Sequence, residues 1–285
     1  MADIGIWGLG SMGMGMGQSL LRAGHRVAGH DVRPGVTLDG GTPLAPEAIS
    51  TAVLVVLNAA QTEDVLFGSS GIADSLAEGA VVIACATVPP AFARDMAARC
   101  STLGLHYLDA PISGGAAKAA TGQLSIMASG SAPAFAAARP ALDAMAETVF
   151  ELGEAGAGSA MKAVNQMLAG THIAAMAEAM VFGMTQGVSP AQFMEVIPSC
   201  AGTSWMLENR GPHIRDGDYT PRSAVPIWLK DLGIVGEIAA AAGIEMPLTE
   251  TALSRFRDAA ALGLSDEDDA AVAKVYARQA GLDLP

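Results

Sequence analysis

The first half of the chain alternates short apolar runs with longer stretches of helical periodicity. The runs are apolar throughout rather than at every second position, which is typical of parallel strands covered on both faces. Strands that alternate with helices predict a doubly wound α/β sheet. The expected strands lie within residues 3–10, 25–31, 52–60, 80–87, 106–113, 123–130 and 148–153.

The strand pattern stops after Gly158, and only helical periodicity follows. A long apolar helix is predicted from about Ser159 to Gln186, with Gly187 as a left-handed cap. The later helices are expected at residues 191–199, 223–243, 247–263 and 266–281. The last of these opens on four acidic residues, which suit a helix N-terminus.

The composition fits a folded protein with a substantial core, since 51% of the 285 residues are hydrophobic and 16% are charged. We expect an α/β domain at residues 1–158 and an all-helical domain at residues 159–285. The net charge of -13 argues against a nucleic acid or an anionic membrane as partner. No signal-peptide pattern precedes the first strand, so we expect a cytoplasmic protein.

Three cysteines, Cys85, Cys100 and Cys200, are odd in number and far apart, and they form no CxxC pair. They suit reduced thiols that pack in the interior, and they predict neither a zinc site nor a disulfide framework. No other cluster of ligands predicts a metal site, so the expected chemistry is metal-free.

A G-x-G-x-x-G turn follows the first predicted strand and opens the first predicted helix. Its glycines allow the backbone to approach a pyrophosphate at the helix N-terminus, and Asp31 ends the next strand, where a carboxylate can bind ribose hydroxyls. A bare structural turn is the alternative, but this context favours a dinucleotide site. The turn comprises Gly8, Leu9, Gly10, Ser11, Met12 and Gly13.

A second candidate site is "DAPISGG" at residues 109–115, which ends a predicted strand in a serine and two glycines. The local sequence fits a tight turn as well as it fits a carboxylate cradle, in which Ser113, Gly114 and Gly115 face an anion. Its position after a strand of the sheet favours the cradle, because the ligands of such sheets collect there.

The long helix carries Lys162 near its start, within a run that is otherwise almost uncharged. The run is long enough to span a bilayer, but its polar residues favour a helix buried in protein. On a 3.6-residue period Lys162 shares one face with Asn165 and Gln166. A lysine amine can accept or donate a proton if loss of hydration lowers its pKa. From these residues alone, a lysine at the edge of a domain remains the simpler interpretation.

The ordered set "GLGSMG", "DAPISGG", "GAGSAMKAVNQ" and "KDLG" resembles the β-hydroxyacid dehydrogenase family over nearly the whole chain. The resemblance implies a Rossmann-type domain and a helical domain joined by one long helix, with NAD as cofactor and the active site in the cleft. It implies that Lys162 is the catalytic acid and base, and that Ser113, Gly114 and Gly115 bind the substrate carboxylate. The other implied positions are Asn165, Gln166 and Lys230 at the substrate, and Asn58, Ala59, Thr87 and Lys230 at the cofactor.

Within this family, "SWMLENR" and "DGDYTPRSAVPIWLKDLG" are similar to the L-threonate dehydrogenase branch, whose members oxidise a trihydroxy acid at C2 with NAD. The expected reaction is therefore oxidation of L-threonate to 2-oxo-tetronate. Asn165 stands where those members have His, which keeps 3-hydroxyisobutyrate dehydrogenase and tartronate semialdehyde reductase open as alternatives. An imine reductase and a non-catalytic NAD-binding module are less favoured, because the lysine and the cleft residues are present. The family pattern also implies a homodimer or homotetramer.

Two features near the second strand bear on the cofactor. Asp31 is expected to repel the 2′-phosphate of NADP, so NAD should be favoured by at least about tenfold in kcat/KM, although Arg33 can swing toward a phosphate. The segment at residues 32–52 has room for little more than a strand and a short helix, which predicts a thin wall of the adenine pocket.

His172 and Trp205 are expected to pack in the core.

Overall fold

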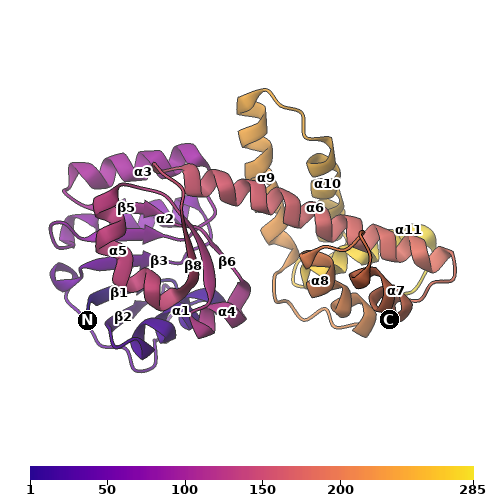
Figure 1. Cartoon of the computed structure of the whole chain (residues 1–285), viewed down its shortest axis with the longest axis horizontal. Coiled ribbons are helices and arrows are strands. Elements are labelled where there is room, and N and C mark those ends of the chain that lie inside the picture. The colour runs from indigo at the N-terminus through magenta and orange to yellow at the C-terminus, as the bar shows by residue number, and fades with distance from the viewer. The chain divides into compact units, whose positions relative to one another are not determined.

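A five-stranded parallel sheet in the order β2-β1-β3-β4-β5 organises the first half of the chain (Figure 1). The computed structural model describes residues 1–285, which form two units, Met1–Lys162 and Ala163–Pro285. The strand order reverses at β1, which pairs with β2 on one side and with β3 on the other. The strands are β1 (Asp3–Trp7), β2 (Arg26–His30), β3 (Thr51–Leu54), β4 (Val81–Ala84) and β5 (His106–Asp109).

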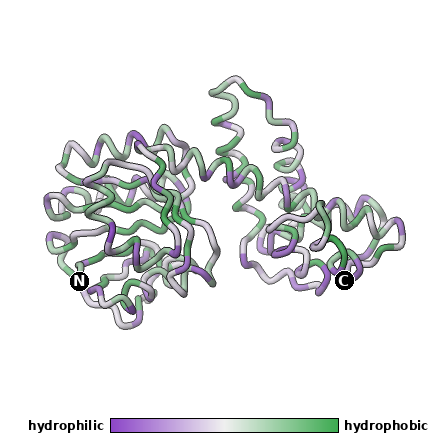
Figure 2. Tube along the Cα trace, in the orientation of Figure 1, coloured by the Kyte–Doolittle hydropathy of each residue, from purple (hydrophilic) through white to green (hydrophobic).

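Helices cover both faces of this sheet, which explains why its strands are apolar at successive positions. Val81 and Ile83 belong to the core shared with α1 and α5, whereas Val82 and Ala84 belong to the core shared with α2 and α3. In Figure 2 the strands of the sheet carry mostly hydrophobic colours. The helices are α1 (Ser11–Arg22), α2 (Ala59–Phe67), α3 (Pro90–Thr102) and α5 (Ala132–Met145), and η2 (Ala73–Ser75) is a short 3-10 turn.

The last three strands of the first unit form a second sheet instead of extending the first. The strand expected at residues 106–113 is divided into β5 and β6, because Pro111 offers no N–H to continue the ladder. Reciprocal backbone hydrogen bonds between Asp109 and Ser129, of 3.0 and 2.8 Å, connect the two sheets. The elements are β6 (Ile112–Ser113), α4 (Gly115–Thr121), β7 (Leu124–Ala128) and β8 (Ala146–Glu151).

The segment between β2 and β3 contains only one short 3-10 turn, η1 (Pro46–Ala48), and no strand, so it holds less regular structure than the strand and short helix for which its length leaves room. Trp7, the last residue of β1, packs against the core on the α2 and α3 side of the sheet, and its ring stacks on His30 with centroids 4.6 Å apart. The indole also lies over Gly5, where a Cβ atom would come within 2.3 Å of the ring.

The second unit is entirely helical, as the sequence predicts. The long helix α6 (Ala157–Thr185) begins in the first unit, and Gly187 follows it with a φ of +82°, which fits the expected left-handed cap. Length and composition alone would allow α6 to cross a membrane, but 39% of its most apolar window is buried in protein. The others are α7 (Pro190–Val196), η3 (Ile197–Ser199), α8 (Trp205–Asp216), α9 (Val225–Ala242), α10 (Pro247–Ala261), η4 (Asp269–Val272) and α11 (Ala273–Ala280).

Three expectations for the helical unit were wrong. Helix α8 was not predicted, because Gly211 and Pro212 interrupt its periodicity. The last helix begins at Ala273 and not among the four acids; Asp269 is instead fully buried and accepts a 2.8 Å hydrogen bond from Trp228 Nε1. Trp205 is 63% exposed and does not pack in the core.

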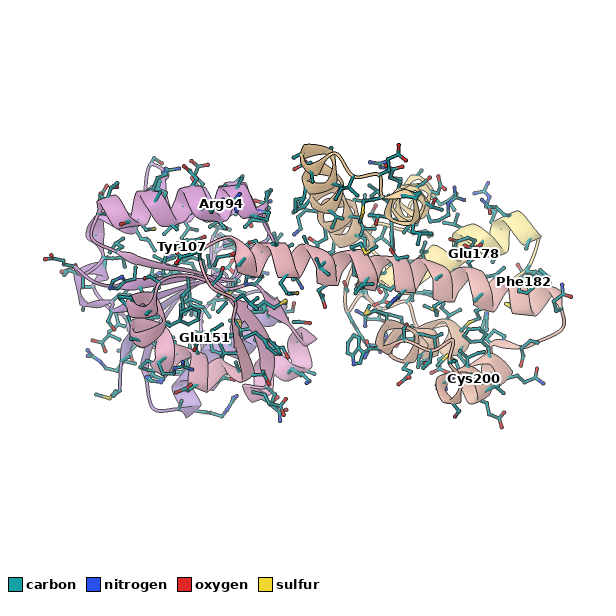
Figure 3. All side chains as sticks on the ribbon, turned by 45° about the horizontal axis from the view of Figure 1, so that its top comes forward. Arg94, Tyr107, Glu151, Glu178, Phe182 and Cys200 are labelled. Carbon is teal, nitrogen blue, oxygen red and sulfur yellow. The ribbon has the colours of Figure 1, made fainter.

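The three thiols differ in burial, which corrects the expectation that all of them pack inside. Cys85 and Cys100 are buried, and burial raises the pKa of each thiol to about 12. Cys200, labelled in Figure 3, is exposed in the connection between η3 and α8.

We expect only Cys200 to react with a thiol reagent in the native protein at mildly alkaline pH, because the thiolate is the reactive form. All three cysteines should react after unfolding in guanidinium chloride, and a Cys200→Ser variant should show no fast-reacting thiol. A fast-reacting thiol in that variant would contradict the burial of Cys85 and Cys100.

Candidate active site

The glycine turn between β1 and α1 has the geometry of a dinucleotide cradle. A Cβ atom at Gly8 would lie 2.2 Å from Val55 O, and one at Gly13 would lie 1.8 Å from Gly8 O, so both positions require glycine. Gly10 faces open space and precedes the first turn of α1, whose amides receive no side-chain cap. The open side of the turn and these amides therefore fit a pyrophosphate.

Asp31 lies beside this turn at the end of β2, as expected. Its Oδ2 accepts a 2.8 Å hydrogen bond from the backbone N–H of Leu9, which fixes the carboxylate against the turn. Arg33 forms an ion pair with the same carboxylate, with 2.8 Å between Nε and Oδ1. Hydrogen bonds from the Arg33 side chain, more than any other cause, hold the pKa of Asp31 well below its usual range.

The other candidate cofactor residues follow the carboxyl ends of β3 and β4, at the same edge of the parallel sheet. Asn58 is the N-cap of α2, since its Oδ1 accepts a 2.9 Å hydrogen bond from Gln61 N, and Ala59 is the first residue of that helix. Thr87 is half-buried in the loop between β4 and α3. Ligands of open α/β sheets bind at this edge, where the strand order reverses.

Lys162 lies in the second turn of α6 and is buried, with 8% of its surface exposed. Its Nζ donates a 3.0 Å hydrogen bond to Ile112 O, and Ile112 immediately precedes Ser113, Gly114 and Gly115. Both glycines of this loop have positive φ angles, of 130° and 75°, that favour glycine. The structure thus brings the candidate lysine and the candidate carboxylate loop together within the first unit.

Asp109 holds the start of α6 in place, and no motif of the sequence indicated a functional role for this residue. Its buried carboxylate accepts hydrogen bonds from Gly156 N at 3.1 Å, from Ser159 N at 2.8 Å and from Ser159 Oγ at 2.6 Å. Ser129 Oγ donates a fourth, at 3.1 Å, and itself accepts one from Gly158 N. Burial raises the pKa of Asp109, and these hydrogen bonds oppose that rise. The first turn of the helix that bears Lys162 is therefore anchored to the end of β5.

The candidate substrate residues of the second unit form a cluster of their own. Asn165 Nδ2 donates a 2.9 Å hydrogen bond to Gln166 Oε1, and Gln166 Nε2 donates to Asp231 Oδ2. Lys230 Nζ lies 2.6 Å from the other carboxylate oxygen of Asp231. Asp231, which is 3% exposed, connects Gln166 to Lys230, and Asn165 joins this group through Gln166. The sequence signal that could have found Asp231 is an acidic residue directly after Lys230 in a mostly apolar stretch.

Lys118, near the glycine loop, is a surface residue in this structure. It lies in α4, and its Nζ is 3.6 Å from a carboxylate oxygen of Glu147, with about half of each side chain exposed. This placement agrees with a surface role.

Comparison with known proteins gives consistent matches over nearly the whole chain. Residues 3–153 match the family model described as the NAD binding domain of 6-phosphogluconate dehydrogenase, and residues 156–276 match the one described as NAD-binding of NADP-dependent 3-hydroxyisobutyrate dehydrogenase. An L-threonate dehydrogenase of Cupriavidus necator is 48% identical over 99% of this chain and 98% of its own length. A 3-hydroxyisobutyrate dehydrogenase of Pseudomonas aeruginosa is 35% identical over 90% and 91%, respectively.

Among solved structures, the crystal structure of a 3-hydroxyisobutyrate dehydrogenase from Salmonella typhimurium is similar with a TM-score of 0.90. Its sequence is 44% identical, and the match covers 96% of this chain and all of that one. With the fold and the glycine cradle, these relatives make the chain an NAD-dependent dehydrogenase of hydroxy acids. The chain belongs to the β-hydroxyacid dehydrogenases of the 3-hydroxyisobutyrate dehydrogenase type, as its four motifs indicate.

Proposed function

We propose that this enzyme oxidises a small polyhydroxy acid, L-threonate, at C2 to 2-oxo-tetronate, with Lys162 as general base. The observation that carries this proposal is the buried Lys162 amine, 3.0 Å from Ile112 O at the start of the Ser113–Gly115 loop. We infer that a carboxylate bound by that loop places its hydroxyl-bearing carbon next to the amine. The L-threonate dehydrogenase of Cupriavidus necator supports this choice of substrate.

In oxidation, the neutral amine of Lys162 accepts the proton of the C2 hydroxyl while the hydrogen on the same carbon leaves as hydride. NAD, when bound, supplies the acceptor for that hydride. In reduction, the ammonium form of Lys162 returns the proton to the carbonyl oxygen. The hydrogen bond to Ile112 O holds the amine in one orientation, and such positioning is a large part of enzymatic rate enhancement.

We assign the orientation of the remaining substrate hydroxyls to Asn165 or Gln166 and to Lys230. The hydrogen bonds through Asp231 support this role, because they restrict the rotamers of Gln166 and Lys230. The cofactor side consists of the Gly8–Gly13 turn for the pyrophosphate, Asp31 for the ribose, and Asn58, Ala59 and Thr87 for the rest of the dinucleotide.

A second candidate substrate is 3-hydroxyisobutyrate. The 44% identical Salmonella structure is described as a 3-hydroxyisobutyrate dehydrogenase. Reduction of tartronate semialdehyde is a further alternative, because Asn165 stands where the resemblance to the threonate branch implies a His.

A substrate panel separates these candidates. In an NADH-formation assay at matched concentrations of threonate, erythronate, glycerate and 3-hydroxyisobutyrate, we expect threonate to be oxidised fastest. The methyl compound should be poorer by more than about tenfold, because it leaves hydrogen-bonding groups of the site unpaired. A faster reaction with 3-hydroxyisobutyrate would contradict the threonate assignment and leave the role of Lys162 intact.

We also propose that the enzyme acts in the cytoplasm as a homodimer or homotetramer. Several large apolar side chains of α6 are more than 45% exposed in the single chain, which supports an association surface. They are Met161, Val164, Leu168 and Phe182, the last of which is labelled in Figure 3.

A further inference from the structure

The carboxylate of Asp31, which should receive the ribose, is already engaged by its own neighbours. Arg33 N and Arg33 Nε donate to Oδ1 at 2.9 and 2.8 Å. Arg33 Nη2 and Leu9 N donate to Oδ2 at 3.0 and 2.8 Å. A carboxylate has roughly four acceptor sites, so these donors occupy its capacity.

The Arg33 side chain also reaches the glycine turn. Its Nη2 lies 3.1 Å from Leu9 O, so one guanidinium bridges the end of β2 and the turn after β1. The two partners differ in exposure, since the Arg33 side chain is 58% exposed and that of Asp31 is 6% exposed. Arg33 can therefore leave the carboxylate for solvent or for a ligand, whereas Asp31 stays in place.

We propose that Arg33 determines the specificity of this enzyme for the adenosine end of its cofactor by competing with the ribose for Asp31. With NAD, the hydroxyls of the ribose replace the guanidinium at the carboxylate. With NADP, Arg33 neutralises Asp31 and pairs with the 2′-phosphate, which Asp31 alone would repel. Discrimination between the two cofactors thus belongs to the Asp31–Arg33 pair rather than to Asp31 alone. This inference rests on the dehydrogenase function proposed above.

The test is direct binding of both cofactors to the full-length protein. NADH and NADPH are titrated while the fluorescence of the reduced nicotinamide is followed, and NAD and NADP are titrated by calorimetry. In the Arg33→Ala variant, the ratio of Kd for NADP to Kd for NAD should rise at least about fivefold relative to the wild type. A smaller change overturns the proposal.

Two controls make the result specific. Arg26→Ala removes an equally charged, half-exposed side chain at the start of β2, where it pairs with Asp3, and it should leave the ratio unchanged. In an Asp31→Asn background, Arg33→Ala should change the ratio less, because only the pairing of Arg33 with the 2′-phosphate is then lost, whereas the wild type also loses the neutralisation of Asp31 and the competition with the ribose. An equal effect in both backgrounds would overturn the mechanism through Asp31.

Different results would contradict the proposed dehydrogenase function and the proposed role of Arg33. If the wild type binds dinucleotides but oxidises none of the hydroxy acids, the proposed function fails and the Kd ratio still tests Arg33. If threonate is oxidised and the ratio does not respond to Arg33→Ala, only the role of Arg33 fails.

Discussion

Replacing Lys162 with alanine is expected to lower kcat for threonate oxidation by at least about a hundredfold, because general acid–base groups typically contribute factors of 10²–10⁴. NAD should still bind, since the glycine cradle and Asp31 belong to the turn between β1 and α1 and to the end of β2, whereas Lys162 belongs to α6 and donates to Ile112 O. Steady-state kinetics with a separate NADH titration measures both quantities.

Two matched variants support the interpretation. Lys162→Arg retains a long cationic donor that stays protonated, so oxidation should be impaired about as severely as in Lys162→Ala. Lys274→Ala removes a partly exposed lysine of α11 that pairs with Glu267, and it should retain near-normal kcat. Because only the neutral amine accepts a proton, wild-type oxidation should accelerate with rising pH and reduction should slow. Near-normal turnover by Lys162→Ala would refute the mechanism.

The second large effect is expected at Asp109. Asp109→Ala leaves the N–H groups of Gly156 and Ser159 without their acceptor in a buried site, and hydrogen bonds to charged groups contribute about 1.5–3 kcal/mol each. We expect the free energy of unfolding to fall by about 3 kcal/mol or more. Asp109→Asn should be milder, since the amide oxygen can still accept from both N–H groups and the amide nitrogen can donate to Ser159 Oγ.

Denaturant unfolding measures this loss, and Asp95→Ala provides the control. Asp95 is an exposed acid of α3 in an ion pair with Arg99, and its removal should change the stability by no more than about 0.5 kcal/mol. Asp109→Asn should also lower kcat more than it changes the Kd for NAD, because Ser159 stands one turn before Lys162. Equal stability of Asp109→Ala and Asp95→Ala would show that the anchor of α6 is energetically unimportant.

Much of the fold could be predicted from the chain, because its signals are local. Buried parallel strands carry continuous apolar runs, and these runs located β4 and β7 to within a few residues. The run at residues 52–60 located the start of β3 but extended into α2. Glycine at a positive φ is a property of one position, so the turn at Gly8 and the cap at Gly187 were recognisable without any tertiary contact. The shortness of the segment after Asp31 likewise predicted that no full helix lies there, although the strand for which it left room is absent.

Local signals fail where an element departs from simple periodicity. Helix α8 was not predicted because Pro212 interrupts its periodicity, and one expected strand is divided between two sheets at Pro111. Burial of individual side chains was also misjudged, since Cys200 and Trp205 are exposed despite their apolar character. Whether a side chain of this kind packs inside depends on which surface the folded chain places next to it.

The partners of the candidate site residues depended on distant parts of the chain. Lys162 bonds to a carbonyl 50 residues earlier, Gln166 to a carboxylate 65 residues later, and Asp109 to the start of α6. The sequence motifs indicated that Lys162 and the glycine loop at Ser113–Gly115 were candidate site residues. They did not show that Asp109 anchors the helix of Lys162, or that Asp231 joins Gln166 to Lys230. The packing of strands and helices brings such residues together, and no periodic pattern in the sequence records which residues become partners.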